Sequence, residues 1–206
     1  ISRIEMISGV PRGGEKGFRT SYSDDYGKTW SEFKHYFPTG KYGGIVAHAS
    51  LTRLKNKKGD MDNKWLGIFH DLNYNNWKTY LSFDENGEEV WTEPVRLLEE
   101  HNLIEKTAQL CEIEVLRSPD GNQLALIARS QGKKNNSMIA FSNDEGETWT
   151  EPLELQGALM GERHKATYDP ISGRLLITFR EIIRDSKKTG DKNDCVAGHW
   201  VAWVGT

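Results

Sequence analysis

Ser23–Trp30, with the sequence SDDYGKTW, and Ser142–Trp149, with the sequence SNDEGETW, carry the same motif and decide the fold. Both stretches fit the pattern S-x-D-x-G-x-T-W at every fixed position. The fixed residues are Ser23, Asp25, Gly27, Thr29 and Trp30 in one copy and Ser142, Asp144, Gly146, Thr148 and Trp149 in the other. Two full matches in one chain indicate an internal repeat.

A degenerate copy lies between the two full ones. Residues 82–91 read SFDENGEEVW, which keeps Ser82, Asp84, Gly87 and Trp91 but has one extra residue before the glycine and another after it. Asp84 lies 59 positions after Asp25 and 60 positions before Asp144. This constant period is close to the length of one four-stranded blade of a β-propeller.

Each fixed position of the motif has a local physical reason. The carboxylate can accept hydrogen bonds from the backbone N–H groups of its own turn, the glycine can adopt a positive φ, and the hydroxyl groups can complete the local network. We expect the tryptophan to start the next strand and to pack inward, so that the motif forms a hairpin between the third and fourth strands of a blade. Asp25 and Asp144 are therefore interpreted as structural rather than catalytic.

The composition agrees with an all-β chain and excludes several classes of protein. Among 206 residues there are seven Trp, seven Tyr, seven Phe and twenty Gly, which suits pleated strands joined by tight turns. The chain shows no run of eighteen apolar residues and no targeting signal, and its formal charge of -3 without a long basic run argues against nucleic acid as a partner. Cys111 and Cys195 are too few for a disulfide framework, and we expect two free thiols.

Alignment of the repeats suggests where a site could form. The sequence predicts one propeller domain over 1–206 with blades at about 1–40, 41–98, 99–157 and 158–206. In this register one position on the first strands is occupied by His48, Glu112 and His164, and the ends of the second strands are occupied by Arg12, His70, Arg129 and Arg180. First strands line the central channel, so these residues are candidates for a pocket, although isolated charges at strand ends can also be merely solvated. Because converging guanidinium groups repel one another, we expect an anionic ligand between them.

The repeated motif resembles the Asp-box (BNR) repeats of the sialidase, or neuraminidase, superfamily, whose fold is a six-bladed β-propeller. The resemblance covers essentially the whole chain. In the third repeat CEIEVLRSPDGNQLALIAR is similar to the family pattern NExxVxELxDGxLxxxxR, with one extra residue between Glu112 and Arg129. The resemblance implies that Glu112 activates the nucleophile and that Arg129 is the second of three arginines that hold the substrate carboxylate.

The same resemblance leaves other roles open. The third arginine is either Arg163 or Arg180, and the register favours Arg180. Arg12, in GVPR, is a weak substitute for the first arginine, and Asp71 is a possible replacement for the acid/base. The family's nucleophilic tyrosine has no clear match, and Tyr168 is expected in the core.

The implied reaction is hydrolysis of a terminal sialic acid from a glycoconjugate, with a sialylated or other acidic glycan as partner. No metal or organic cofactor is expected, because His48, His70 and His164 come from different blades without ligand spacing. About three and a half blades cannot close, so we expect this chain to be a fragment of a six-bladed protein that is secreted, periplasmic or on the cell surface. The alternatives are a non-catalytic propeller that binds glycan or protein and a glycosidase of another specificity.

Overall fold

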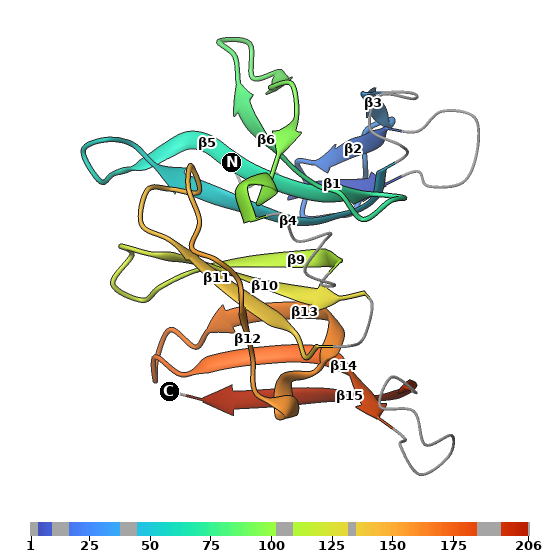
Figure 1. The fold of residues 1–206 in the computed structure, drawn as a ribbon. Helices are drawn as coiled ribbons and strands as arrows, with labels where there is room; N and C mark the ends of the chain where they lie inside the picture. Colours follow the sequence, from blue (N-terminus) through green and yellow to red (C-terminus); the bar gives the residue numbers. More distant parts are fainter. Residues whose placement is uncertain are drawn as a thin grey trace.

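The computed structural model describes residues 4–9, 17–37, 45–101, 109–131, 135–184 and 195–205. Within these residues the chain forms four antiparallel sheets that follow one another in sequence order (Figure 1). The first sheet contains β1 (Ile4–Gly9), β2 (Phe18–Ser23) and β3 (Lys34–Tyr36). The second contains β4 (Ile45–Lys55), β5 (Met61–Asp71), β6 (Asn76–Phe83), β7 (Glu89–Trp91) and β8 (Val95–Arg96), which pairs with β6.

The two remaining sheets have the same meander order. The third contains β9 (Leu110–Arg117), β10 (Leu124–Ser130), β11 (Met138–Ser142) and β12 (Leu153–Glu154). The fourth contains β13 (Gly161–Tyr168), β14 (Leu175–Arg184) and β15 (Cys195–Gly205). Short 3-10 turns lie at η1 (Glu99–His101) and η2 (Gly157–Leu159). The predicted all-β propeller architecture is confirmed, and the sheets form an incomplete propeller.

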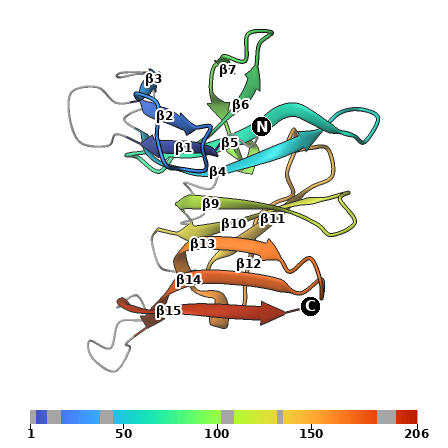
Figure 2. The same ribbon diagram turned by 180° about the vertical axis from the view of Figure 1, so that it is seen from behind.

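The first strands of the sheets lie next to one another. β1 contacts β4, β4 contacts β9, and β9 contacts β13. Figure 2 shows the same succession from behind, with β4, β9 and β13 one after another. These strands therefore form the inner side of the propeller, and a residue at one level of one strand lies close to the same level of the next.

Each pair of neighbouring sheets shares a hydrophobic cluster. Leu126 on β10 is buried with Leu66 and Ile68 of β5, whereas the adjacent Ile127 is buried with Ile177 and Phe179 of β14. Successive side chains of a strand point to opposite faces, so β10 contributes to two interfaces at once. Phe18, Ile45 and Phe69 form the corresponding cluster between the first two sheets. Burial on both faces is what fixes the register of these strands.

The motif of the third sheet holds its own turn. Ser142 Oγ donates to Asp144 Oδ1 at 2.8 Å, and Asp144 accepts from the Thr148 N–H at 2.9 Å and from Thr148 Oγ1 at 2.6 Å. The motif of the first sheet repeats these contacts, and hydrogen bonds from the Thr29 hydroxyl and N–H lower the pKa of Asp25 to about 2. Asp84 of the degenerate copy still accepts from two N–H groups of its turn, those of Asn86 and Glu88. The three carboxylates are thus engaged by their own turns.

The motif glycine of the third sheet has no room for a side chain. Gly146 has a φ of +84°, and a Cβ atom placed on it would lie 2.8 Å from Leu66 Cδ2 in the second sheet. The turn thus packs closely on the neighbouring blade, and only glycine meets both conditions.

The motif tryptophans differ from the expectation. Trp149 is buried, with 6% of its surface exposed, whereas Trp30 is 40% exposed, so inward packing is wrong for Trp30. Trp149 packs in the cluster between the second and third sheets. Trp30 instead donates its indole N–H to the carbonyl of Gly27 at 3.1 Å. Neither residue starts a strand, because β3 begins at Lys34 and β12 at Leu153.

The described part of the chain includes no helix with the length and apolar character needed to cross a bilayer.

Candidate functional site

Irregular strand positions lie at one level of the inner side. Pairing of β9 with β10 shifts between Ile127 and Arg129, and pairing of β13 with β14 shifts between Glu162 and Lys165. At these bulges Glu112 has a φ of 49° and Arg163 a φ of 59°. Positive φ is costly for such residues, and bulges and strained backbone concentrate at functional sites because they re-aim side chains. This level of the inner strands is therefore the candidate site.

The structure shifts the expected register of the fourth sheet by one residue. Arg129 pairs with Cys111 and Arg180 pairs with Glu162, so Glu112 is equivalent to Arg163 and not to His164. The expected equivalence of Glu112 with His164 places Gly121 and Gly173 at the same position, but these glycines occupy different positions in their turns. The Gly121 N–H bonds to the carbonyl three residues earlier and the Gly173 N–H to the carbonyl four residues earlier.

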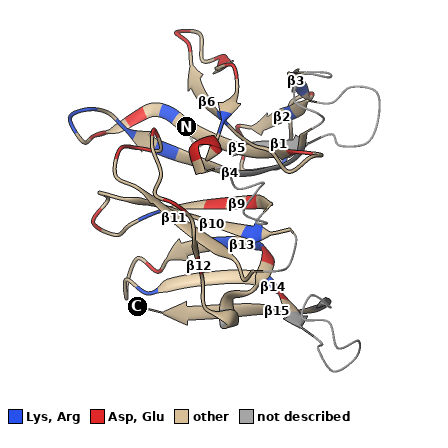
Figure 3. Cartoon of the chain, viewed as in Figure 1, with Lys and Arg blue, Asp and Glu red and all other residues tan. Residues whose placement is uncertain are grey.

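Four charged side chains from two sheets form an ion cluster. Arg129 Nη1 lies 3.1 Å from Glu112 Oε1 and 2.9 Å from Glu162 Oε2. Glu162 Oε1 in turn pairs with Arg180 Nη2. Figure 3 shows acidic and basic segments next to one another on β9, β10 and β13. We call Glu112, Arg129, Glu162 and Arg180 the ion cluster.

Glu162 is the residue that the sequence reasoning missed. Its side chain is only 4% exposed, and its carboxylate bridges the two arginines. Glu162 in the fourth sheet and Cys111 in the third sheet occupy equivalent positions. An alignment in the observed register places the carboxylate of Glu162 opposite Arg180. This pairing is the sequence signal that identifies Glu162.

The ion cluster contains its own negative charges. Two guanidinium groups and two carboxylates have no net charge, so the chain supplies the anions that separate Arg129 from Arg180. The expectation that the arginines need an external anion to relieve their repulsion is therefore wrong. The Nε atoms of Arg129 and Arg180 are nevertheless buried, and neither has a hydrogen-bond partner among the described residues. Buried donors without a partner are costly, and a ligand oxygen could satisfy them.

Glu112 is held by both strands that flank it. Besides its contact with Arg129, its Oε2 accepts the backbone N–H of Arg163 at 3.0 Å. The Arg163 side chain is exposed and outside the ion cluster, whereas Arg180 lies inside it. Of the two candidates for the third arginine, the structure brings only Arg180 together with Arg129.

His70 is a buried neighbour of the cluster. Its Nδ1 lies 2.9 Å from the carbonyl of Asp71, which can only accept, so Nδ1 carries the proton and Nε2 is an acceptor. Nε2 is buried without a hydrogen-bond partner among the described residues. Burial lowers the pKa of His70, although the nearby charge of Glu112 opposes this shift. A neutral imidazole acceptor beside the ion cluster suits a hydroxyl donor on a ligand.

His164 is buried, and its side chain packs in the interior. Its Nε2 lies 3.0 Å from Ser137 Oγ, and its ring stacks on Phe179 at 5.5 Å. Burial lowers the pKa of His164 to about 4. The ring is therefore neutral at pH 7 and packs like an apolar side chain.

Asp71 is part of a turn and does not join the ion cluster. Its Oδ1 accepts the N–H groups of Asn73 and Asn75 at 2.8 and 2.9 Å, and its Oδ2 accepts from the Asn75 side chain and from Trp77 Nε1. Both oxygens are occupied by residues within the same connection. Asp71 resembles the motif carboxylates in this respect and lacks a position from which to donate a proton to a ligand at the cluster.

The remaining predicted residues fall into three groups. Arg12 lies outside the described residues, and so do the side chains of His48 and Cys195, although His48 and Cys195 are on described strands. Cys111 is a buried free thiol, and burial raises its pKa to about 12, so it is protonated and not a nucleophile. Tyr168 is half-buried at the end of β13 rather than in the core. In the described parts of the chain, no three His, Cys, Asp or Glu side chains gather as metal ligands would.

Comparisons with known proteins agree with this architecture. The model of the BNR repeat-like domain family matches residues 6–160. No curated protein sequence matches the chain significantly.

Solved structures with the same fold act on different sugars. An α-L-arabinofuranosidase from Podospora anserina, in complex with cellotriose, is 13% identical with a TM-score of 0.61, over 98% of this chain and 60% of that one. The intramolecular trans-sialidase from Ruminococcus gnavus, in complex with oseltamivir carboxylate, is 18% identical with a TM-score of 0.57, over 91% and 40%. A sialidase from Streptococcus pneumoniae is 17% identical with a TM-score of 0.51, over 80% and 23%. The chain thus spans less than two thirds of each of these proteins, and at such identities the likeness establishes the fold.

Proposed function

Because this chain belongs to the family of BNR repeat-like domains, we propose that it carries part of the active site of an exo-acting glycoside hydrolase of the sialidase type. The proposed substrate is a glycoconjugate with a terminal sialic acid or a related acidic sugar. Its site is the ion cluster on the inner side of the third and fourth sheets.

One observation carries the proposal. Glu112 contacts Arg129 from a strained bulge, and Glu162 ties Arg129 to Arg180. The buried Nε donors of both arginines have no hydrogen-bond partner within the described parts of the chain. A substrate carboxylate can accept these two N–H groups, and hydrogen bonds between guanidinium and carboxylate are stronger than neutral ones. Because the two guanidinium groups balance the two carboxylates, the cluster has no net negative charge that would repel an anionic ligand.

The residues of the cluster have separate roles in this proposal. Arg129 and Arg180 orient the substrate, and Glu162 is a positioning residue that holds both guanidinium groups. Glu112 is placed to accept a proton from a nucleophile, as the resemblance to sialidases implies. The nucleophile and the acid are roles that none of the four residues fills, and the proposal needs no metal or organic cofactor.

A second candidate function rests on the carboxylates themselves. Glu112 and Glu162 both contact Arg129 Nη1, so two carboxylates from adjacent inner strands face one guanidinium nitrogen. A pair of close carboxylates is the usual equipment of glycosidases for neutral sugars, with one as acid and the other as nucleophile or base. The neutral charge of the cluster suits such a substrate as well. A propeller that binds glycan without cleaving it is the third alternative.

Turnover of chromogenic substrates by the complete protein distinguishes these functions. The proposal predicts release from an aryl sialoside and not from an aryl α-L-arabinofuranoside. Glu112→Gln should lower kcat by about 100-fold or more, and Arg129→Lys should lower kcat/KM by about 10- to 150-fold because the planar fork is lost. Arg117→Lys is the matched control, because Arg117 forms a bidentate ion pair with Glu145 outside the cluster, and it should retain activity.

The other outcomes separate the alternatives. Cleavage of the arabinofuranoside alone, abolished by both Glu112→Gln and Glu162→Gln, would replace the sialidase proposal by the two-carboxylate one. Binding without cleavage of either substrate would favour the non-catalytic propeller.

A further inference from the structure

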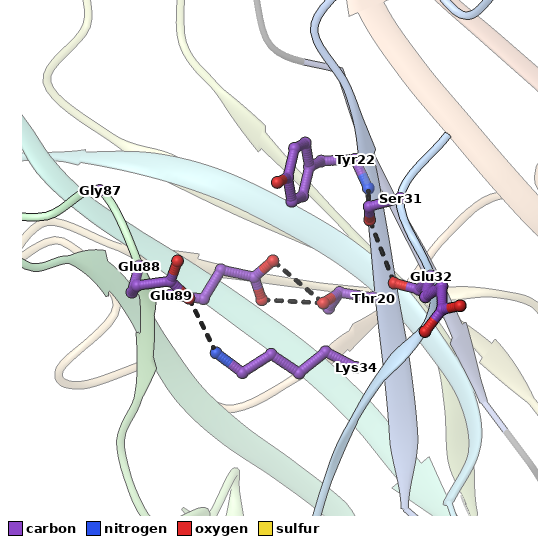
Figure 4. A pocket seen from close by; sticks show the side chains of 8 residues that line it. All are labelled: Thr20, Tyr22, Ser31, Glu32, Lys34, Gly87, Glu88 and Glu89. Atoms are coloured by element: carbon purple, nitrogen blue, oxygen red, sulfur yellow. Dashed lines mark hydrogen bonds and ion pairs between the residues drawn. The ribbon is translucent and has the colours of Figure 1, made fainter. Parts of the chain in front are cut away.

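Two adjoining hollows lie at the first sheet, and one of them extends to the second sheet. The first, of about 260 Å³, is lined by residues of β2 and β3 and by the turn Gly87–Glu89 (Figure 4). The second, of about 330 Å³, lies around the motif turn of the first sheet and includes Asp24 and Trp30. Tyr22 and Ser31 line both hollows, so they form one continuous polar and aromatic surface. The ion cluster lies on other strands, β9, β10, β13 and β14.

The floor of the first hollow is fixed. Thr20 Oγ1 lies 3.0 and 2.9 Å from the two carboxylate oxygens of Glu89, which also accepts from Trp91 Nε1 at 3.0 Å. Thr20 is buried, and Trp91 packs against Phe18 of the first sheet. The carboxylate is therefore held in one orientation by two neighbouring blades, and such pre-organised polar groups bind a ligand at low entropic cost.

The wall of the first hollow carries exposed hydrogen-bonding groups. Lys34 Nζ lies 3.2 Å from Glu88 Oε2, and both side chains are more than half exposed. An exposed pair of this kind is weakly held, so both groups can turn to a ligand. Ser31 lines both hollows, but its hydroxyl already accepts the Tyr22 N–H and donates to the Glu32 carbonyl, each at 3.1 Å. A sugar presents adjacent hydroxyls that can donate to a carboxylate and accept from an ammonium.

Aromatic side chains provide the complementary surface. Tyr22 is 36% exposed and Trp30 is 40% exposed, and both line the second hollow. The hydrogen bond from Trp30 Nε1 to the Gly27 carbonyl fixes the indole plane. Rigid aromatic rings with exposed apolar faces, next to a few oriented polar groups, match the apolar C–H faces and polar edges of sugar rings.

We propose that these hollows form two neighbouring subsites for an unbranched neutral oligosaccharide, separate from the ion cluster. The carboxylates of Glu32 and Glu88 line the first hollow together with the ammonium group of Lys34, and the carboxylate of Asp24 lines the second. Among the residues that line the two hollows carboxylates outnumber ammonium groups, so the surface disfavours an acidic sugar. Tyr22 and Trp30 stack on successive sugar rings, and Lys34 and Glu88 bind hydroxyl groups. The site binds a neutral glycan chain independently of the ion cluster.

Binding of neutral hexaoses to the complete protein tests this site. Cellohexaose, xylohexaose and mannohexaose are titrated separately, and Trp fluorescence and ligand NMR report binding. At least one should bind with a Kd on the order of 1 mM, as expected for a shallow polar site, and sialyllactose should not compete. Tyr22→Ala should weaken binding about fivefold or more, and Glu88→Gln should weaken it about two- to fivefold. Tyr26→Ala is the control, because Tyr26 lies on the same turn with 77% of its surface exposed but lines neither hollow.

The result stands apart from that for the inner site. Arg129→Lys should leave hexaose binding unchanged even where it abolishes turnover. The site is refuted if no hexaose binds at about 20 mM, or if folded Tyr22→Ala and Glu88→Gln proteins bind as well as the wild type.

Discussion

At the residue scale, the carboxylate of Glu162 is the counter-ion of two guanidinium groups. It is almost completely buried and contacts both Arg129 and Arg180. Removing one member of a buried ion pair leaves the other charge uncompensated, which is more costly than removing an exposed pair. The stability of the inner side should therefore depend on this single side chain.

Glu162→Gln should lower the free energy of unfolding by about 3 kcal/mol, because the guanidinium groups of Arg129 and Arg180 then lose the buried carboxylate that lies between them. Urea unfolding at pH 7 measures the change. Glu88→Gln, which breaks the exposed pair with Lys34, should change stability by less than about 1 kcal/mol. Equal effects of the two substitutions would contradict the bridging role.

His164 provides a prediction about pH. Its pKa is about 4 in the folded chain against an ordinary value of 6.5, and burial is the main cause. Between these two pH values the imidazole is protonated in the unfolded chain but neutral in the folded chain. The free energy of unfolding therefore falls as the pH falls from about 6.5 to 4. This residue should account for a loss on the order of 3 kcal/mol, and His70, whose pKa is also lowered, adds to it.

Denaturant unfolding across this pH range tests the assignment. His164→Gln should be less stable than the wild type at pH 7 but show a shallower slope. Ser137→Ala removes the hydrogen-bond partner of His164 and keeps the titrating ring, so it should retain the slope. An unchanged slope in His164→Gln would show that other groups cause the acid sensitivity.

At the scale of elements, the two complete motif copies have the same local geometry but different surroundings. Trp149 lies in the cluster shared by the second and third sheets, and Trp30 lies at an open hollow of the first. The motif therefore determines the turn, while the neighbouring blade determines the burial of its tryptophan.

Trp149→Ala should destabilise the chain by about 3 to 5 kcal/mol through the cavity that it leaves. Trp30→Ala should cost less than about 1 kcal/mol, because the ring is largely exposed. Thermal and urea unfolding of the two variants provide a direct comparison. Similar losses would contradict the different surroundings of the two rings.

The sequence predicted what depends on nearest neighbours in the chain. The turns at Asp25 and Asp144 could be predicted because their hydrogen bonds run within a few residues. The strands that carry Glu112 and Arg129 were predicted as one hairpin, but the ion pair between the two side chains was not predicted. Glu162 was missed because a one-residue difference between two turns shifted the alignment. Asp71 was proposed as a replacement for the acid/base because it follows His70. Its turn contacts, with Asn73, Asn75 and Trp77, belong to no repeated motif that would have predicted them.

At the scale of the whole molecule, the motif turns also join the blades. Buried Lys78 of β6 donates to the carbonyls of Gly146 and Glu147 in the motif of the third sheet, each at 2.9 Å. Glu145 of the same turn accepts from the Lys55 N–H of β4 at 2.7 Å. The degenerate copy likewise contacts the first sheet through Glu89 and Thr20. Each of these turns is tied to the preceding blade, so the motif turns join the first three sheets to one another.

Lys78→Met should lower the free energy of unfolding by about 1 to 3 kcal/mol, because buried carbonyls of the neighbouring turn lose their donor. Lys34→Met, which removes an exposed ammonium group, is the control and should cost less than about 1 kcal/mol. Wild-type stability of Lys78→Met in urea unfolding would show that the turns do not join the blades energetically.

The proposed function requires that an acidic sugar bind at the ion cluster on the inner side of the propeller. A crystal structure of the complete protein with a 2,3-unsaturated sialic acid analogue measures that position directly. The account predicts the ligand carboxylate within about 3 Å of guanidinium nitrogens of both Arg129 and Arg180, with Glu162 still bridging them. An analogue bound away from these arginines, or a carboxylate held by other residues while the ion cluster stays closed, would contradict it.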